Sequence, residues 1–350
     1  RLHGSPMALL LVYFLASLQL GSAERPIQQN SRVELHVHLD GSVTVETLLD
    51  VAIQRQLDIP GIGVPKTQQD IWMALNNVTS PWQRFDVVND IVGGDEDALR
   101  LVAERFVERQ AWQGVGYTEV RYDPVRMARS DYSGDKITER EAIKAISEGL
   151  KAASEKHGIA VYSLLCAMRG KPGSACMEVA ELAAAVRSRD LGGVVGLDLA
   201  GDESTYNNSE YIACFRYAKE VLNLNTTVHA GESVGTQDDV KSAILEMKVD
   251  RVGHGYASTS DPEILEVLAA SEVHLEACPH GAARRGFLKA IGTYEAMGLS
   301  FGLNEDDPTQ YFENCTMAGT EEIVVDGLDF SAAAVATAYL HARAAAFGPT

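Results

Sequence analysis

The sequence predicts an α/β protein, a single (β/α)₈ TIM-type barrel with a helical insertion after the first strand. Three observations favour this fold. Short runs rich in apolar and β-branched residues alternate with longer helical stretches about eight times after residue 32, the pattern of a parallel sheet closed into a barrel. The length of 350 residues suits one such domain. Polar residues also follow the ends of the short runs, where barrel enzymes assemble their sites.

The eight expected strands are separated mainly by helical stretches. The strands cover residues 33–38, 116–121, 160–165, 194–199, 226–229, 251–254, 273–277 and 299–303. Helical patterns include residues 138–156, 175–187, 238–247 and 262–270, and a mainly helical insertion at 43–114 separates the first two strands. An open, doubly wound sheet would show the same alternation, but the number of units and the placement of the polar residues favour the barrel. No repeat or linker divides the sequence, so we expect one domain.

The first residues of the chain differ from the rest. Residues 7–20 are a short apolar run, followed by the small residues Gly21 and Ala23. The run is too short to cross a bilayer comfortably, but it has the length of a signal-peptide core. An ordinary buried helix is the alternative. We expect residues 1–23 to be a signal-peptide-like segment, residues 24–350 to form the barrel domain, and the protein to be secreted or otherwise cytoplasmic, without a membrane span.

The charge of the chain argues against one class of partner. The formal net charge is −19, and the sequence has no basic run of the kind that binds nucleic-acid phosphate. Nucleic acid is therefore not an expected partner, and the oligomeric state stays open. Glycosylation would agree with secretion, and Asn-x-Ser/Thr acceptors stand at Asn77, Asn207, Asn225 and Asn314. Asn225 begins an expected strand and is the acceptor least suited to a glycan.

The five cysteines show no regular spacing and no Cys-x-x-Cys pair. Such a pattern gives no disulfide framework, so one bridge is conceivable but cannot be assigned. Cys166 and Cys278 lie in apolar runs, where a free buried thiol behaves as a small hydrophobic side chain.

The segment His36-Val37-His38 is the first with a chemical implication. In a strand, residues i and i+2 point to the same side, so both imidazoles face one point. Inside a barrel that point is the lumen, where two neutral imidazoles can hold Zn²⁺. A His-x-His pair taken alone also occurs by chance or for structural reasons.

Three later segments add groups of matching chemistry. His229 ends an expected strand, and Glu232 lies on the loop after it, where it could instead cap a helix. His254 stands between glycines that allow backbone or substrate to come close. Asp306 and Asp307 follow the last strand; neighbouring acids in a dry pocket repel unless a cation is present, although Asp before Pro also caps helices. Histidine and carboxylate side chains that gather at strand ends are ligand types suited to zinc.

The motifs HVHLDGS, LDLAGDE, TVHAGE, RVGHGY and NEDDP, in this order, closely resemble those of the adenosine deaminase family within the metal-dependent amidohydrolases. The match runs from about Arg32 to Pro308, and the C-terminal part fits more loosely. The resemblance implies one zinc ion per subunit, with water completing its coordination. Its protein ligands would be His36, His38, His229 and Asp306.

The same resemblance implies the catalytic groups. His254 would orient and deprotonate the water, and Glu232 would donate a proton to purine N1. Attack at C6 pushes electrons toward N1, so a protonated carboxyl there stabilises the intermediate. Asp306 would take part in catalysis as well as in metal binding, and His38 would also lie against the substrate.

Further residues would recognise a purine nucleoside. By the resemblance, Asp307 would meet N7, the backbone N–H of Gly201 would meet N3, and Asp40 would hold the ribose 5′-hydroxyl. Trp82 and Phe85 would contribute to a hydrophobic lid over the ribose end, unless they are ordinary core aromatics.

Two segments depart from the family pattern. Glu305 stands where a small Ser or Thr usually precedes the paired aspartates, and we expect it to add a negative charge beside the metal. After Cys278-Pro279 the chain continues with residues 280–283, His-Gly-Ala-Ala, in place of a Ser- and Asn-bearing segment. Every inferred ligand is retained, so these changes bear on rate and metal affinity.

The function that the sequence favours is zinc-dependent hydrolytic deamination of adenosine and 2′-deoxyadenosine to inosine and 2′-deoxyinosine, with release of ammonia. A carboxylate at Asp40 would accept a bond from a 5′-hydroxyl but repel a phosphate, which disfavours AMP. One alternative is a deaminase of another 6-aminopurine or of an N6-substituted purine. The other is a weakly active secreted protein with a binding or signalling role.

Overall fold

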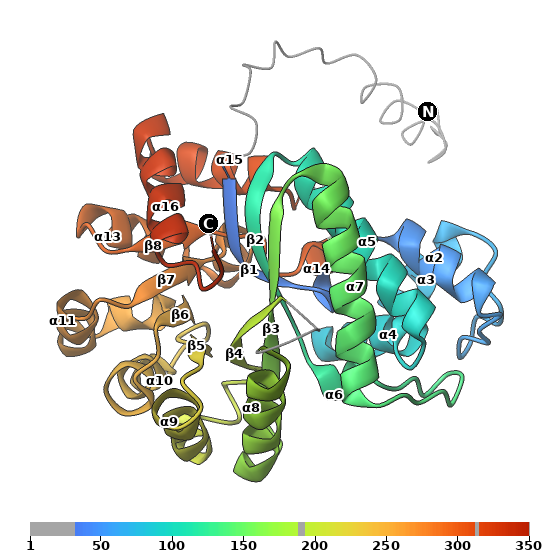
Figure 1. The fold of residues 1–350 in the computed structure, drawn as a ribbon. Coiled ribbons are helices and arrows are strands. Elements are labelled where there is room, and N and C mark those ends of the chain that lie inside the picture. The colour runs from blue at the N-terminus through green and yellow to red at the C-terminus, as the bar shows by residue number, and fades with distance from the viewer. Residues whose placement is uncertain (1–31, 188–192, 312–314, 350) are drawn as a thin grey trace, which may run out of the picture.

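Eight parallel strands follow one another around a nearly closed barrel in the computed structural model, which describes residues 32–187, 193–311 and 315–349 (Figure 1). Their order in the sheet is their order in the chain. The strands are β1 (Arg32–His38), β2 (Val115–Tyr122), β3 (Ala160–Met168), β4 (Val194–Ala200), β5 (Asn225–Ala230), β6 (Arg251–His254), β7 (His274–Ala277) and β8 (Phe301–Leu303). The expected fold and all eight expected strands are confirmed, with β8 beginning two residues later than expected.

The barrel closes where β1 meets the residues after β8. Val37 forms a parallel bridge with Asp306. The backbone N–H of His38 donates to the carbonyl of Asp306 at 3.0 Å, and the N–H of Asp306 donates to the carbonyl of His36 at 2.9 Å. Three residues of the expected metal site therefore form the seam of the barrel.

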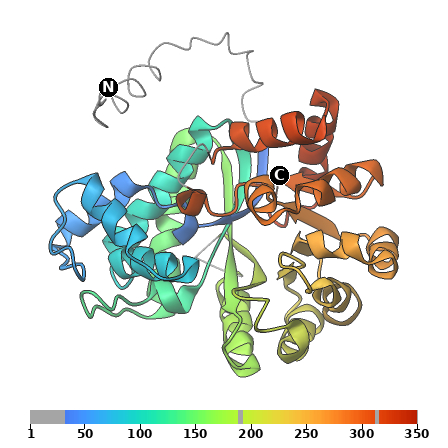
Figure 2. The same ribbon diagram turned by 180° about the vertical axis from the view of Figure 1, so that it is seen from behind.

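Helices surround the strands, and the inserted helices lie together at one side of the barrel (Figures 1 and 2). The insertion between β1 and β2 contains η1 (Asp40–Ser42), α2 (Val45–Gln54), α3 (Gln68–Asn76) and α4 (Pro81–Val92), followed by α5 (Glu96–Trp112). The next connections contain α6 (Pro124–Met127), α7 (Glu139–His157), α8 (Gly173–Arg187), η2 (Asn208–Glu210), α9 (Ile212–Glu220), α10 (Gln237–Ser242) and η3 (Ala243–Met247). The remaining helices are η4 (Tyr256–Ser260), α11 (Pro262–Ala270), α12 (Pro279–Arg285), α13 (Leu288–Ala296), α14 (Pro308–Tyr311), α15 (Met317–Leu328) and α16 (Ala332–Ala344).

Local sequence explains where the best-predicted helix begins and ends. At the start of α7, the Thr138 side chain accepts a bond from the N–H of Glu141, and the Glu141 carboxylate accepts one from the N–H of Thr138. Such a capping box pairs N–H groups that the helix leaves unsatisfied. Gly158 ends the helix at φ +69°, a conformation that glycine adopts without strain. The helix expected at 238–247 differs, because its second half is the π-helical turn η3.

Alternate residues of β1 have opposite surroundings. Val33, Leu35 and Val37 are buried and belong to the hydrophobic core, as expected for side chains that face the surrounding helices. Glu34 and His36 share the other face of the strand and are equally buried. Because the lumen of a barrel is a packed interior, polar groups on this face need partners inside it.

The lumen contains a network of buried ion pairs below the site. Arg121 contacts Asp198 at 3.3 Å and Glu276 at 2.8 Å. Arg251 contacts Glu276 and Glu119, both at 2.7 Å. All five side chains are essentially inaccessible to solvent. A buried charge is tolerated when it is paired and hydrogen-bonded, so this network replaces the apolar layers common in barrels.

The C-terminal segment covers the end of the lumen opposite the site. The Phe347 ring lies 3.6 Å from the guanidinium carbon of Arg251. The backbone N–H of Phe347 donates to Glu119 at 2.6 Å, and that of Gly348 donates to the Tyr117 hydroxyl at 2.8 Å. These contacts pair the segment with Glu119 and Arg251 inside the lumen and with the Tyr117 hydroxyl, and the C-terminus accordingly lies near the middle of the ring in Figure 1.

A disulfide joins two neighbouring outer helices. Cys176 in α8 is bonded to Cys214 in α9, with 6.0 Å between their α-carbons. Cys166 and Cys278 are free and buried, as expected, and so is Cys315. Among the described residues, no helix combines the length and apolar character needed to span a membrane. The signal-peptide-like segment at 1–23 lies outside the described residues.

Candidate active and metal-binding site

The expected ligand residues converge at the C-terminal ends of the strands. His36 and His38 end β1, His229 lies near the end of β5, and Asp306 follows β8. The Nε2 atoms of His38 and His229 are 3.1 Å apart, and His36 Nε2 lies 3.4 Å from Asp306 Oδ1. One ligand atom from each of the four residues lies within 4.8 Å of the others. Three imidazoles and a carboxylate are a donor set typical of Zn²⁺ and similar divalent ions.

Carboxylates behind two of the imidazoles set their orientation. His36 Nδ1 bonds to Glu276 at 2.7 Å. His229 Nδ1 contacts Asp198 at 3.2 Å and the carbonyl of Leu199 at 3.1 Å. These contacts place the proton on Nδ1 and leave Nε2 as the lone-pair donor directed into the cluster. His36 Nε2 is buried and has no hydrogen-bond partner among the described residues. These residues therefore fit a metal ion.

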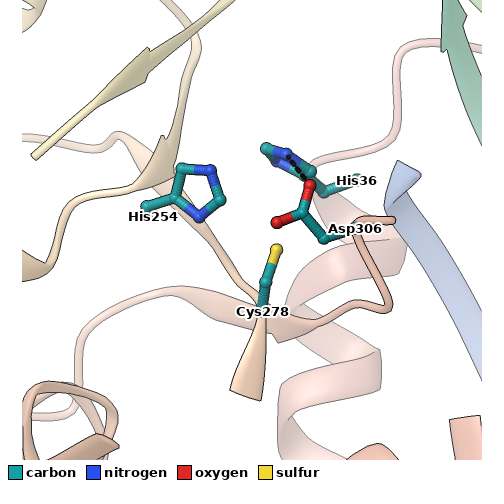
Figure 3. Close-up of side chains that lie close together, drawn as sticks. All are labelled: His36, His254, Cys278 and Asp306. Carbon is teal, nitrogen blue, oxygen red and sulfur yellow. Dashed lines mark ion pairs between the residues drawn. The ribbon is translucent and has the colours of Figure 1, made fainter. Parts of the chain in front are cut away.

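A second group of possible metal ligands overlaps the first. Figure 3 shows His254 at the end of β6, Cys278 after β7, and the shared residues His36 and Asp306 directed at a common centre. One ligand atom from each of these four residues again lies within 4.8 Å of the others. His254 therefore lies beside the expected metal position, in reach of a group bound there.

Two residues of the site have strained backbone conformations. His254 has φ +67° and Asp306 has φ +70°, values that residues other than glycine rarely adopt. Such strain persists where surrounding contacts enforce it, often at functional sites. Gly253 explains the close packing beside His254, because a β-carbon at this position would lie 2.8 Å from Cε1 of His36.

Glu232 faces the site from the loop after β5. Its Oε1 lies 3.7 Å from His254 Nε2 and forms an ion pair with Arg285 of α12. Burial raises the pKa of Glu232 to about 7, although Arg285 acts in the opposite direction. A carboxyl with this pKa is partly protonated at neutral pH, as a proton donor requires. Arg285 was not expected from the sequence, where the available signal was the arginine pair that follows residues 280–283.

Asp40 and Asp307 lie on either side of Gly41. Asp40 accepts hydrogen bonds from Asn89 of α4 at 2.9 Å and from the N–H of Gly41 at 3.1 Å. A side chain at Gly41 would collide with the carboxylate of Asp307. Burial, and then the neighbouring charges of Asp306 and Asp40, raise the pKa of Asp307 well above its usual value. Asp307 therefore favours the protonated form.

The remaining expected residues lie directly after β4 and on α4. Gly201 directly follows β4 and has φ +105°, which only glycine adopts readily. Trp82 and Phe85 lie on α4, the helix that carries Asn89, with ring centroids 6.1 Å apart. Trp82 is 47% exposed, so it is not a core aromatic. Its expected part in a lid remains a prediction.

Glu305 was expected to add a negative charge beside the metal, but it has a cationic partner. Its carboxylate receives two hydrogen bonds from Arg109 of α5, at 2.9 and 2.7 Å, and weaker ones from Gln110 and Gln113. Glu305 is fully buried. Its charge is therefore matched by a guanidinium from the outer layer and is not an uncompensated charge beside the metal.

The charged residues that support the imidazoles were not predicted from the sequence. Arg121, Asp198 and Glu276 lie within the strands β2, β4 and β7. A charged residue inside an otherwise apolar strand was the available signal, because it must find a partner when buried. Which side chains would pair depended on the closure of the barrel.

Comparisons with known proteins agree with this site. A family model described as adenosine deaminase matches residues 31–350. The adenosine deaminase of Danio rerio is 33% identical over 328 residues, which cover 88% of this chain and 88% of that protein.

Two solved structures share the fold. An adenine deaminase from Arthrobacter aurescens has a TM-score of 0.78 at 20% identity, covering 91% of this chain and 94% of that one. An Arabidopsis N6-mAMP deaminase has a TM-score of 0.75 at 25% identity, covering 92% and 95%. The chain therefore belongs to the adenosine deaminase family, whose members are hydrolases of the amidohydrolase fold that act on C–N bonds.

Proposed function

We propose that this protein is a zinc-dependent adenosine deaminase, which converts adenosine and 2′-deoxyadenosine to inosine and 2′-deoxyinosine and releases ammonia. The observation that carries the proposal is the group of His36, His38, His229 and Asp306 beside a carboxyl, Glu232, whose pKa is raised to about 7. In this proposal, the metal ligands and the proton donor Glu232 act together at one end of the barrel.

The two halves of the reaction fall to different residues. A bound zinc ion would supply a Lewis acid and lower the pKa of water toward about 7. His254 accepts the proton of the attacking water in this proposal, because its Nε2 is buried without a hydrogen-bond partner among the described residues, and burial lowers the pKa of its imidazole and so favours the neutral ring that an acceptor requires. Glu232 gives its proton to purine N1 as water adds to C6. The proton held by His254 then passes to the 6-amino group, the C6–N bond breaks with release of ammonia, and the C6-hydroxyl proton returns to Glu232 as the C6=O bond forms.

Purine recognition follows from the hydrogen-bonding character of the ring. The ring nitrogens N1, N3 and N7 of adenine are acceptors, so each needs a donor. Glu232 and Asp307 have raised pKa values and can donate as protonated carboxyls. The backbone N–H of Gly201 is the third donor in this proposal. Hypoxanthine carries a proton on N1, so the product loses the bond from Glu232.

Asp40 supports a nucleoside as substrate. It already accepts bonds from Asn89 and from the backbone of Gly41, and a 5′-hydroxyl could donate another. A 5′-phosphate would place negative charge against the Asp40 carboxylate, which disfavours AMP and N6-methyl-AMP. Free adenine would leave the 5′ subsite without a partner.

The test is ultraviolet-monitored turnover by the purified chain. Adenosine, 2′-deoxyadenosine, AMP, N6-methyl-AMP and adenine run in parallel, with and without chelation. Adenosine turnover that chelation abolishes and zinc restores is the expected result, with both nucleotides and adenine nearly inert. Glu232→Gln, which retains shape but cannot donate an acidic proton, should lower kcat by about 10²–10⁴.

Other outcomes separate the alternatives. Faster turnover of N6-methyl-AMP or of adenine would show that this compound, and not adenosine, is the preferred substrate. The proposed deaminase chemistry would still hold. A full complement of zinc with no turnover of any substrate would contradict the proposal. That result would favour the weakly active binding protein considered from the sequence.

A further inference from the structure

The two groups of metal ligands share two members. His36 and Asp306 belong to both, whereas His38 and His229 complete the first and His254 and Cys278 complete the second. All four members of the second group are almost completely buried. Figure 3 shows their side chains around one centre, with the Cys278 thiol beside the carboxylate of Asp306.

The second group contains ring nitrogens that need a partner. His36 Nε2 and His254 Nε2 are buried and lack hydrogen-bond partners among the described residues. The other nitrogen of His36 is bonded to Glu276 at 2.7 Å, and that of His254 faces the Tyr256 hydroxyl at 3.4 Å. His36 Nε2 lies 3.4 Å from Asp306 Oδ1, and one ring nitrogen of His254 lies within 4.8 Å of ligand atoms of Cys278 and Asp306. A buried acceptor without a partner costs free energy that a cation would relieve.

We propose that His36, His254, Cys278 and Asp306 form a second metal site, which takes a thiophilic divalent cation such as Cd²⁺ and excludes zinc from the neighbouring position. The thiolate makes this site softer than the first one, and soft ligands favour soft cations. On binding, the Cys278 S–H bond breaks, its proton passes to solvent, and the sulfur forms a bond to the cation; no group changes oxidation state.

The second ion would exclude zinc from the first site because both sites need His36. Its Nδ1 is engaged by Glu276, so a single Nε2 lone pair remains, and one lone pair can bind one ion. An ion held by His254 and Cys278 therefore removes His36 from the zinc position. The two sites are alternatives for one chain and do not form a binuclear centre.

The test is titration of the metal-free full chain with Cd²⁺, followed by the thiolate-to-cadmium charge-transfer absorption in the ultraviolet. The band is expected in the wild-type protein and lost in Cys278→Ser. Cys166→Ser and Cys315→Ser are matched controls, because they remove the other free buried thiols, and both should keep the band. Circular dichroism checks that each variant is folded.

A second pair of variants separates the two sites without removing a thiol. His254→Asn should weaken Cd²⁺ binding by more than the roughly 10–100-fold typical of losing a residue that only orients a ligand, whereas His38→Asn should leave Cd²⁺ affinity nearly unchanged. For Zn²⁺ the effects should be reversed. Cadmium binding without a thiolate band, a band that survives Cys278→Ser, or equal effects of both histidine variants on both ions would overturn the proposal. None of these readouts depends on catalytic activity.

Discussion

Glu232 has an environment that acts on its proton in opposing directions. Burial raises its pKa, the Arg285 guanidinium lowers it, and the Asp306 carboxylate raises it. The net result is a pKa of about 7. On the proposed mechanism the protonated form is active, so kcat/KM should fall as the pH rises through this pKa.

Removal of Arg285 should therefore change the pH dependence of the reaction. In Arg285→Ala the cation that favours ionised Glu232 is absent, so the pKa of Glu232 rises and the alkaline limb of the kcat/KM profile moves to higher pH. Arg284→Ala is the matched control, since it removes a neighbouring positive charge from the same helix, and its limb should stay near that of the wild type. A limb that moves to lower pH in Arg285→Ala would contradict this account.

The individual residues of the site were largely predictable because a parallel barrel brings all of its strand ends together. His36, His229 and Asp306 are separated by long stretches of chain, yet their positions at strand ends were enough to expect them at one place. Arg285 was not predictable in this way. It reaches Glu232 from a helix, and neither periodicity nor spacing indicates where a long side chain on an altered loop will point.

At the scale of elements, a side-chain contact joins the outer helix α5 to the residues after β8 and so supports the site. Arg109 of α5 pairs with Glu305, the neighbour of Asp306, and also donates to the carbonyl of Cys315 at 2.6 Å. Asp306, which has a positive φ, therefore has an anchored neighbour in Glu305, and its own backbone is hydrogen-bonded to β1 at the seam. The sequence predicted a mainly helical insertion at 43–114, which contains α5, and the strand that precedes Glu305, but the pairing of Arg109 with Glu305 required the three-dimensional fold.

Loss of one partner of this pair should cost more than loss of both. Arg109→Met leaves Glu305 buried and unpaired, which should lower the free energy of unfolding by about 3–5 kcal/mol. Arg109→Met combined with Glu305→Thr removes both charges and should recover most of that loss. Chemical denaturation measures each value.

An exposed pair on the same helix provides the control for this cycle. Arg105 pairs with Glu108 at 2.9 Å on the exposed surface, so Arg105→Met should change the free energy of unfolding by less than about 1 kcal/mol. Equal destabilisation by Arg105→Met and Arg109→Met would show that the buried pair has no special role. A double variant that is destabilised more than Arg109→Met alone would show the same.

At the scale of the whole molecule, the barrel is covered at the end opposite the site and is tied across its outer layer. The segment at Phe347 covers the lower end of the lumen, and the disulfide between Cys176 and Cys214 joins α8 to α9. Sequence could not assign this disulfide, because five cysteines without regular spacing allow many pairings. Only the packing of α8 against α9 brings these two sulfurs together.

The disulfide links stability to the compartment in which the protein works. Disulfides persist in oxidising environments such as the secretory pathway, so this bridge supports the proposal that the protein is secreted. It closes a loop of 38 residues, and such a cross-link typically stabilises a fold by about 2–4 kcal/mol. Cys176→Ala combined with Cys214→Ala should lower the free energy of unfolding by that amount, whereas Cys166→Ala keeps the bridge and should remain as sensitive to reducing agent as the wild type.

Expression of the full chain in cells with a secretory pathway tests secretion and the disulfide in one experiment. The expected product is found in the medium, begins at Glu24 after removal of residues 1–23, and contains Cys176 and Cys214 as a disulfide by peptide mapping. Reducing agent should then lower its denaturation midpoint and leave that of the double alanine variant unchanged, because the variant has no bridge to lose. A product that stays inside the cell, retains its first residues and has both thiols free would contradict secretion, while the barrel and its metal ligands would be unaffected.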